Sequence, residues 1–182
     1  MKSEWSRISL LFFFLVGIAG TVLRSTAFVE IPLEYMNLVH AHSHVAFQGW
    51  IYTIMFLFLI RTYLKEDQIQ KGRYPLQFKL TVVVVTGVLI SFAVQGYAFY
   101  SILFSTFFQL LNYWFIYRFL NDTRASGSVI DPPVSLRFVK AGLWFGLLST
   151  LLPIGIGILS AKKMSESEAY QSLVYTFLHL QY

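Results

Sequence analysis

Long apolar runs separated by short basic connections constrain this chain more than any other feature. The runs cover residues 8–28, 36–60, 80–120, 138–160 and 169–182. An α-helix rises 1.5 Å per residue, so about 20 apolar residues cross the roughly 30 Å hydrocarbon layer of a bilayer. Hydrophobic residues make up 56% of the chain, charged residues only 13%, and the mean hydropathy is +0.60. These values exclude an ordinary soluble domain and indicate an integral membrane protein.

The third run is about twice as long as one span and therefore has to contain a turn. We divide residues 80–120 at 95–97, where Gln, Gly and Tyr combine polarity with a flexible residue. Residues 61–79 carry too many charges to enter lipid, and 121–136 have the Asn, Asp, Gly, Ser and Pro density of a loop. Both segments are predicted to be connections between spans.

The last two runs are less regular. Pro153 lies inside the run 138–160, where it removes a backbone donor and is expected to kink the helix. The final run, 169–182, reaches only about 21 Å as a helix, which is short of the bilayer core. The sequence thus predicts an all-α, polytopic transmembrane helix bundle with about five complete spans and a truncated sixth. We interpret residues 1–182 as a single domain that forms the N-terminal part of a longer protein.

The distribution of lysine and arginine predicts the orientation of the bundle, because cytoplasmic connections are enriched in these residues. Three of the 14 basic residues fall on one side, namely Arg24, Lys162 and Lys163. The rest fall on the other side: Lys2, Arg7, Arg61, Lys65, Lys71, Arg73, Lys79, Arg118, Arg124, Arg137 and Lys140. This asymmetry predicts a cytoplasmic N-terminus and all four histidines in the outer half of the bilayer.

Three histidines stand at alternate positions near the start of the second run. On a helix His40, His44 and Gln48 share one face, whereas His42 points almost oppositely. Neutral imidazole is the commonest metal ligand in proteins, and its second nitrogen is usually held by a neighbouring polar group. Gln48 and Ser43 are the nearest groups for that supporting role. One helix can therefore offer one or two imidazoles to a single site, but not readily all three.

The three histidines differ in depth along the second run. His40 lies near the interface, where an unliganded histidine is ordinary, and His42 can equally bind a ligand or face a neighbouring helix. His44 is deepest and is followed by the small Ala46 and Gly49, which let another group approach the helix. An ionisable side chain without a partner is costly in lipid, so we favour His44 as a ligand.

Several kinds of protein are disfavoured by composition. Cysteine is absent, so any metal has to be held by nitrogen or oxygen. Every Asp and Glu lies in a connection or a terminus, which argues against a proton-coupled transporter. No nucleophile and base stand at an identifiable spacing, so an enzyme with hydrolytic or transfer chemistry is disfavoured. The basic residues lie in connections rather than on one face, which does not indicate binding to nucleic acid.

The segment from His42 to Trp50, HSHVAFQGW, resembles the second-helix motif of subunit I of heme-copper oxidases and nitric oxide reductases. It is similar in particular to small bacterial membrane proteins of that superfamily, of the Bacteroidetes type, that carry HAHSH near the N-terminus. In this superfamily the helix-two histidine is an axial ligand of the low-spin heme. Matching on Gly49 and Trp50 implies that His44 is the ligand, with His42 as its nearest competitor.

The segment 175–182, YTFLHLQY, is similar to the sixth-helix region of the same proteins. In the oxidases that helix supplies a histidine to copper, followed by a proline-glutamate pair, whereas Leu180 and Gln181 follow His179 here. The resemblance implies His179 as a metal ligand or as a partner of His44. His40 is the further metal-ligand candidate.

The resemblance implies a heme-binding membrane protein related to cytochrome c oxidase subunit I, with a role in electron transfer. Its cofactors would be heme and, through His179, copper. If the protein is an enzyme, the resemblance implies an oxidoreductase, and its partners would be the lipid bilayer, other membrane subunits or a redox partner. Two alternatives stay open: a transporter or sensor that binds zinc or copper through the histidine cluster, and a scaffolding subunit whose histidines only form interhelical hydrogen bonds.

Overall fold

A computed structural model describes residues 3–124, 134–161, 164 and 166–181. All regular secondary structure in these residues is helical, as the sequence predicts. The chain divides into two compact units, Met1–Ile130 and Asp131–Tyr182. The expectation of one domain over the whole chain stays a prediction.

The first unit contains four helices that are long and apolar enough to cross a membrane, counted among the described residues. These four candidate spans confirm the first four spans predicted from the sequence. The second span, Tyr35–Tyr63, is one continuous helix built from an α-helical, a π-helical and a second α-helical segment. The helices of this unit are α1 (Ser3–Ser25), α2 (Tyr35–His44), η1 (Val45–Ile51), α3 (Tyr52–Tyr63), α4 (Glu66–Lys71), α5 (Tyr74–Gln95) and α6 (Phe99–Asp122).

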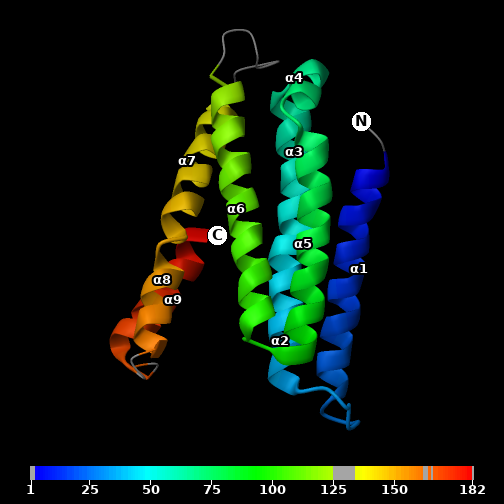
Figure 1. The fold of residues 1–182 in the computed structure, drawn as a ribbon, viewed down its shortest axis with the longest axis vertical. Helices are drawn as coiled ribbons and strands as arrows, with labels where there is room; N and C mark the ends of the chain where they lie inside the picture. The colour runs from blue at the N-terminus through cyan, green and yellow to red at the C-terminus, as the bar shows by residue number, and fades with distance from the viewer. Residues whose placement is uncertain (1–2, 125–133, 162–163, 165, 182) are drawn as a thin grey trace. The chain divides into compact units, whose positions relative to one another are not determined.

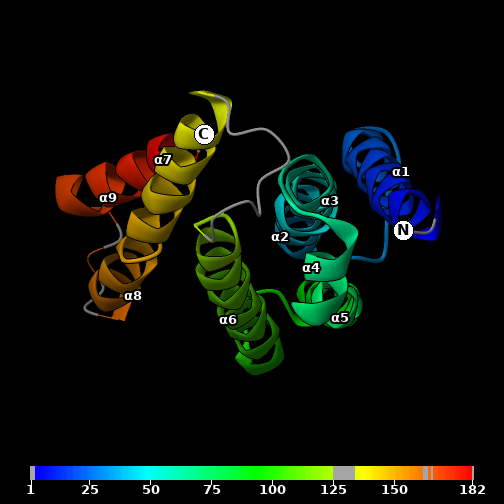
Figure 2. The same ribbon diagram turned by 90° about the horizontal axis from the view of Figure 1, so that it is seen from above.

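The four spans of the first unit run up and down, so that consecutive spans are antiparallel neighbours (Figure 1). Viewed from the end, α1 lies beside the second span, which lies beside α5, and α6 follows on the far side of α5 (Figure 2). Apolar side chains fill the contacts between them: Phe12, Val45, Val85 and Phe108 form one buried cluster. The second span is therefore held on two sides, by α1 and by α5.

The connection predicted over residues 61–79 is partly helical, which corrects that prediction. The short helix α4 lies inside it, and α5 begins at Tyr74, six residues earlier than the predicted span. Pro75 sits in the first turn of α5, where its missing N–H costs no helical hydrogen bond. Tyr74 is fully buried, and this apolar contact extends the helix beyond the hydrophobic run.

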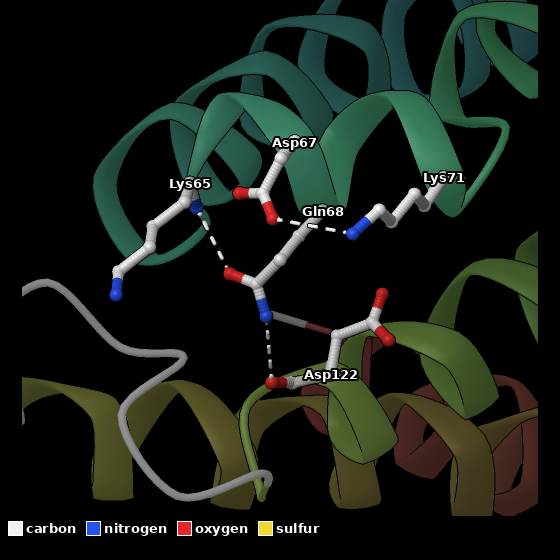
Figure 3. Close-up of polar contacts among 5 residues, drawn as sticks. All are labelled: Lys65, Asp67, Gln68, Lys71 and Asp122. Atoms are coloured by element: carbon white, nitrogen blue, oxygen red, sulfur yellow. Dashed lines mark hydrogen bonds and ion pairs between the residues drawn. The ribbon is translucent and has the colours of Figure 1, made fainter.

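Helix α4 is tied to the end of α6 by polar contacts (Figure 3). The backbone N–H of Lys65 donates to Oε1 of Gln68 at 3.0 Å, and Nε2 of Gln68 donates to the carbonyl of Asp122 at 3.5 Å. Lys71 and Asp67 form an exposed ion pair at 3.7 Å. We call this end of the first unit the basic end, because Lys65, Lys71, Arg73 and Arg118 belong to it.

A buried aromatic contact reinforces the same end. The hydroxyl of Tyr74 donates to Oδ2 of Asp122 at 2.7 Å. The guanidinium carbon of Arg118 lies 4.2 Å from the ring centroid of Tyr74 and 4.6 Å from that of Trp114. Stacking on aromatic rings is a favourable environment for guanidinium. The first turn of α5 is thereby fixed to the last turns of α6.

The opposite end of the first unit, which we call the histidine end, contains the turn predicted at 95–97. Helix α5 ends at Gln95 and α6 begins at Phe99, so the prediction is confirmed. Gly96 has a φ of +63°, a conformation that residues with a side chain rarely adopt. A Cβ at Gly96 would also collide with the carboxamide of Asn37. Glycine is therefore required here to bring the turn against the start of α2.

The second unit contains α7 (Val134–Ser149), α8 (Leu152–Ala161) and α9 (Glu168–Gln181). The run predicted as one kinked span is two helices, with the break at Thr150 and Leu151. Pro153 explains the break, because its ring clashes with the carbonyl of the residue four positions earlier, Ser149, where α7 ends. The fifth and sixth spans stay predictions. Most of the predicted loop 121–136 lies outside the described residues.

Candidate functional site

The three clustered histidines lie in the last two turns of α2, directly before the π-helical segment η1. A π-helix turns more slowly than an α-helix, and such segments occur frequently at functional sites. Gln48, Gly49 and Trp50 all belong to η1. The residues that the sequence singled out are thus contiguous with the one irregular stretch of the second span.

His42 faces α1. Its Nδ1 lies 3.1 Å from the carbonyl oxygen of Val16. Because a carbonyl can only accept, Nδ1 carries the proton and Nε2 keeps its lone pair. The ring rests against Gly20, where a Cβ would lie 3.1 Å from Cε1 of His42. A backbone carbonyl and a glycine together hold this imidazole in one tautomer and one place.

His44 faces α5, and it contacts an aromatic ring, a phenol and a carboxamide. Its ring stacks on Phe92 with centroids 4.2 Å apart and an interplanar angle of 14°. Nε2 of His44 lies 3.1 Å from the hydroxyl of Tyr97, and Nδ1 lies 3.3 Å from Nε2 of Gln48. His40 lies on the same side, with its ring edge-on to Tyr97 at a centroid distance of 4.6 Å. His40, His44 and Gln48 therefore lie on one face of the second span, as the sequence predicts.

Tyr97 is a site residue that the sequence reasoning missed. It follows Gly96 in the turn between α5 and α6 and is 62% exposed. The sequence did contain an indication of this contact. If the second and third spans pair antiparallel, the turn that contains Tyr97 lies next to the start of α2. Sequence reasoning located the turn but did not ask which side chain it presents to the histidines.

The two groups predicted to support an imidazole behave differently. Gln48 contacts the ring of His44 as expected, and its Oε1 is buried without a hydrogen-bond partner. A half turn of this carboxamide brings Oε1 to Nδ1, and the ring then carries its proton on Nδ1. The hydroxyl of Ser43 instead faces the carbonyls of Val39 and His40 in its own helix, at 3.0 and 3.1 Å. Ser43 contributes to the helix rather than to a ring.

Gly49 and Trp50 pack the second span against α1. A Cβ at Gly49 would lie 3.1 Å from the ring of Phe12, and the ring centroids of Trp50 and Phe13 are 4.4 Å apart.

His179 belongs to α9 in the second unit, where its Nδ1 lies 2.8 Å from the carbonyl of Tyr175 and its ring stacks on that residue. The pairing of His179 with His44 stays a prediction.

The two faces fit a metal in different ways. No group of three or more His, Asp or Glu side chains is placed to hold a metal ion within the part of the chain that the structure describes. A heme needs fewer protein ligands than a metal ion alone, because the porphyrin supplies four nitrogens and the chain supplies only one or two axial ligands. His42 meets that demand with an oriented ring and a lone pair on Nε2. His44 meets it only if Tyr97 moves away from Nε2.

The fold and the site together define an all-helical protein with four candidate membrane-spanning helices and a histidine-rich second span. No protein-family model matches the chain, and no curated protein or solved structure matches it either.

Proposed function

We propose that this protein is a heme-binding integral membrane protein with a role in electron transfer, and that His42 is an axial ligand of the heme. The observation that carries the proposal is the hydrogen bond from Nδ1 of His42 to the carbonyl of Val16. Metal-ligating histidines almost always donate their other ring N–H to a carbonyl, a carboxylate or water. That bond fixes the tautomer and the orientation that an axial ligand needs.

The surroundings of His42 support this assignment. Gly20 leaves room for the imidazole, because any side chain there would press on Cε1. A bound heme would supply one-electron redox chemistry. The chain's part is to hold the ring of His42 and to keep Nε2 unprotonated.

The choice of His42 over His44 departs from the match on Gly49 and Trp50, which favoured His44. In favour of the change, the partner of His42 is a backbone carbonyl that can only accept. Nε2 of His44 already meets the hydroxyl of Tyr97, which a heme would have to displace. The resemblance to heme-copper oxidase subunit I supports either residue, because both lie within its motif.

The proposal extends to the setting of the site. The N-terminus would be cytoplasmic in a bacterial inner membrane, because the basic end collects most of the lysines and arginines of the first unit. The histidine end would then face outward. The chain would complete its bundle with a fifth span and a sixth, and a second axial ligand would come from His179 or from a partner subunit. If the partner subunit supplies the second axial ligand, His179 would be available to bind copper.

The test is the optical spectrum of the full chain purified from heme-replete cells. We expect a Soret band that is lost in His42→Ala and retained in His44→Ala, with both variants matched to the parent in thermal unfolding. Partial recovery of the band in His42→Gly on addition of imidazole would separate lost ligation from misfolding. A colourless parent protein would overturn heme binding, and loss of the band in His44→Ala alone would return the ligand role to His44.

A further inference from the structure

We propose that His40, His44 and Tyr97 form a second metal site, for a divalent transition-metal ion, on the face of the second span opposite to His42. This site is distinct from the proposed heme site and does not depend on it. The sequence alternative treated the three histidines as one cluster. The structure separates them and adds an oxygen donor from the turn between α5 and α6.

The spacing of the donors suits a metal ion. With bonds of about 2.0 to 2.1 Å, neighbouring ligand atoms lie about 3.3 Å apart in a tetrahedral site and about 2.9 Å apart in the square-planar geometry that Cu²⁺ prefers. Nε2 of His44 and the hydroxyl oxygen of Tyr97 are 3.1 Å apart. The separation of this nitrogen and this oxygen therefore suits a hydrogen bond and a bridging cation almost equally well. When the cation binds, it replaces the proton that the two atoms share.

The second imidazole comes from the helix itself. His40 precedes His44 by four residues, and pairs of histidines at this spacing on one helical face are a recurrent way to bind zinc. Both rings stand edge-on to the ring of Tyr97, with centroid distances of 4.6 Å for His40 and 5.9 Å for His44. Both imidazole rings therefore flank the ring of Tyr97, whose hydroxyl is the oxygen donor.

The groups behind the site hold it in shape. Phe92 supports the ring of His44 by stacking, and Gly96 fixes the turn that presents Tyr97. Nε2 of Gln48 lies 3.3 Å from Nδ1 of His44. After a half turn of the carboxamide, its unpartnered Oε1 would take that position as the acceptor that a ligating imidazole requires. An otherwise costly buried oxygen would gain a partner when the metal binds.

Access and donor type indicate the ion. Tyr97 is largely exposed at the histidine end, so an ion can reach the site from the aqueous phase beside the membrane. Two imidazoles and a phenol oxygen suit the later first-row metals, and Cu²⁺ has the highest affinity in the usual order. Binding releases the phenol proton of Tyr97 to solvent as the oxygen coordinates the ion.

The experiment titrates Cu²⁺ into the full chain in nanodiscs, followed by calorimetry and electron paramagnetic resonance. We expect one equivalent with nitrogen hyperfine structure and a phenolate-to-copper absorption band. His44→Ala and His40→Ala should each weaken binding at least about tenfold. Tyr97→Phe, an exposed and conservative change, should remove the absorption band and weaken binding. His42→Ala is the matched control and should bind Cu²⁺ as the parent does.

The outcome is separable from that of heme binding. Both proposals would be supported by a Soret band lost only in His42→Ala, together with copper binding that weakens in His40→Ala, His44→Ala and Tyr97→Phe but not in His42→Ala. Copper binding that is insensitive to His40, His44 and Tyr97 would overturn the second site whatever the Soret band does. An equal loss in His42→Ala would also overturn it, because one cluster would then explain the data. Zn²⁺, which has no redox chemistry, should compete with Cu²⁺ for the same site, and the displacement of bound Cu²⁺ measures this competition.

Discussion

The two faces of the histidine end use the same residue type in different chemical settings. On the α1 face, His42 meets a backbone carbonyl and a glycine. On the α5 face, His44 meets an aromatic ring, a phenol and a carboxamide. A backbone partner fixes one tautomer, whereas phenol and carboxamide can each donate or accept. Two histidines two residues apart therefore have different hydrogen-bonding environments.

The neighbouring helices create this difference. Helix α1 approaches the second span closely at Gly20 and Gly49, where small residues allow backbone and ring to touch. Helix α5 presents Phe92 and then ends in the turn at Gly96, which adds Tyr97. The histidine motif on the second span therefore contributes to two separate sites. Helix α1 completes one of them, and α5 with the following turn completes the other. Variants that alter one face and spare the other test this comparison.

The largest effect is expected from Gly20→Val, which fills the space that His42 occupies on α1. The new side chain would press on Cε1, because even a Cβ lies 3.1 Å from it. We expect loss of the Soret band and a fall in unfolding free energy of about 1–3 kcal/mol from overpacking. Copper affinity on the α5 face should not change.

Gly17→Ala is the matched control for that variant, because a Cβ at Gly17 meets no atom within 4 Å. It should keep the heme spectrum of the parent, and its unfolding midpoint should not fall, because alanine favours a helix more than glycine does. If Gly20→Val retained the band, the ring of His42 would not be held as the α1 face requires, and the assignment of the axial ligand would be wrong.

Next in size is Gly96→Ala, which acts on the α5 face. A non-glycine residue at a φ of +63° and ψ of −142° costs about 1–3 kcal/mol. The new Cβ also collides with Asn37. We expect a lower unfolding midpoint and weaker copper binding, measured by thermal unfolding and calorimetry, because Tyr97 is displaced. The Soret band should persist.

A double variant separates the two causes of that loss. Asn37→Ala in the Gly96→Ala background removes the collision but leaves the unfavourable φ. We expect partial recovery of stability. Full recovery would mean that the backbone conformation costs little, and no loss in the single variant would remove Gly96 as the element that positions Tyr97.

The sequence predicted the helices better than their ends. The length of the apolar runs identified the four candidate spans, and the residues Gln95, Gly96 and Tyr97 identified the turn. These sequence features do not show which residues are buried in the folded protein. For this reason the start of α5 at Tyr74 was not predicted. Pro153 was expected to kink a helix, and the chain instead ends α7 at Ser149, because nothing in the sequence says whether neighbours compensate a lost hydrogen bond.

The candidate site was predictable up to the limit of one helix. Helical geometry separated His42 from His40 and His44, and it offered Gln48 and Ser43 as supporting groups, of which Gln48 contacts His44. It could not supply Val16, Phe92 or Tyr97, because these residues come from α1, α5 and the following turn. Those contacts depend on how helices pack, which a pattern on one helix does not encode.

A smaller effect is expected from Gln48→Leu, which sharpens the comparison within the α5 face. His44 would lose its partner at Nδ1, and copper affinity should fall by about tenfold. Unfolding free energy should not fall, because the change also removes the buried Oε1 that has no partner. Ser43→Ala, whose hydroxyl serves its own helix, is the control and should change neither quantity. A parallel loss of stability and affinity would indicate a packing role for Gln48 instead.

The smallest effect belongs to the basic end, which serves as a reference for both faces. Tyr74→Phe deletes the hydroxyl that donates to Asp122 at 2.7 Å and leaves the ring in contact with Arg118. One hydrogen bond to a half-buried carboxylate contributes about 1 kcal/mol, so the unfolding midpoint should drop by a few degrees. The Soret band and the copper isotherm should match those of the parent, because neither face contacts Tyr74. A change in either would mean that the two ends of the bundle are coupled, and the two faces could then no longer be treated as independent local sites.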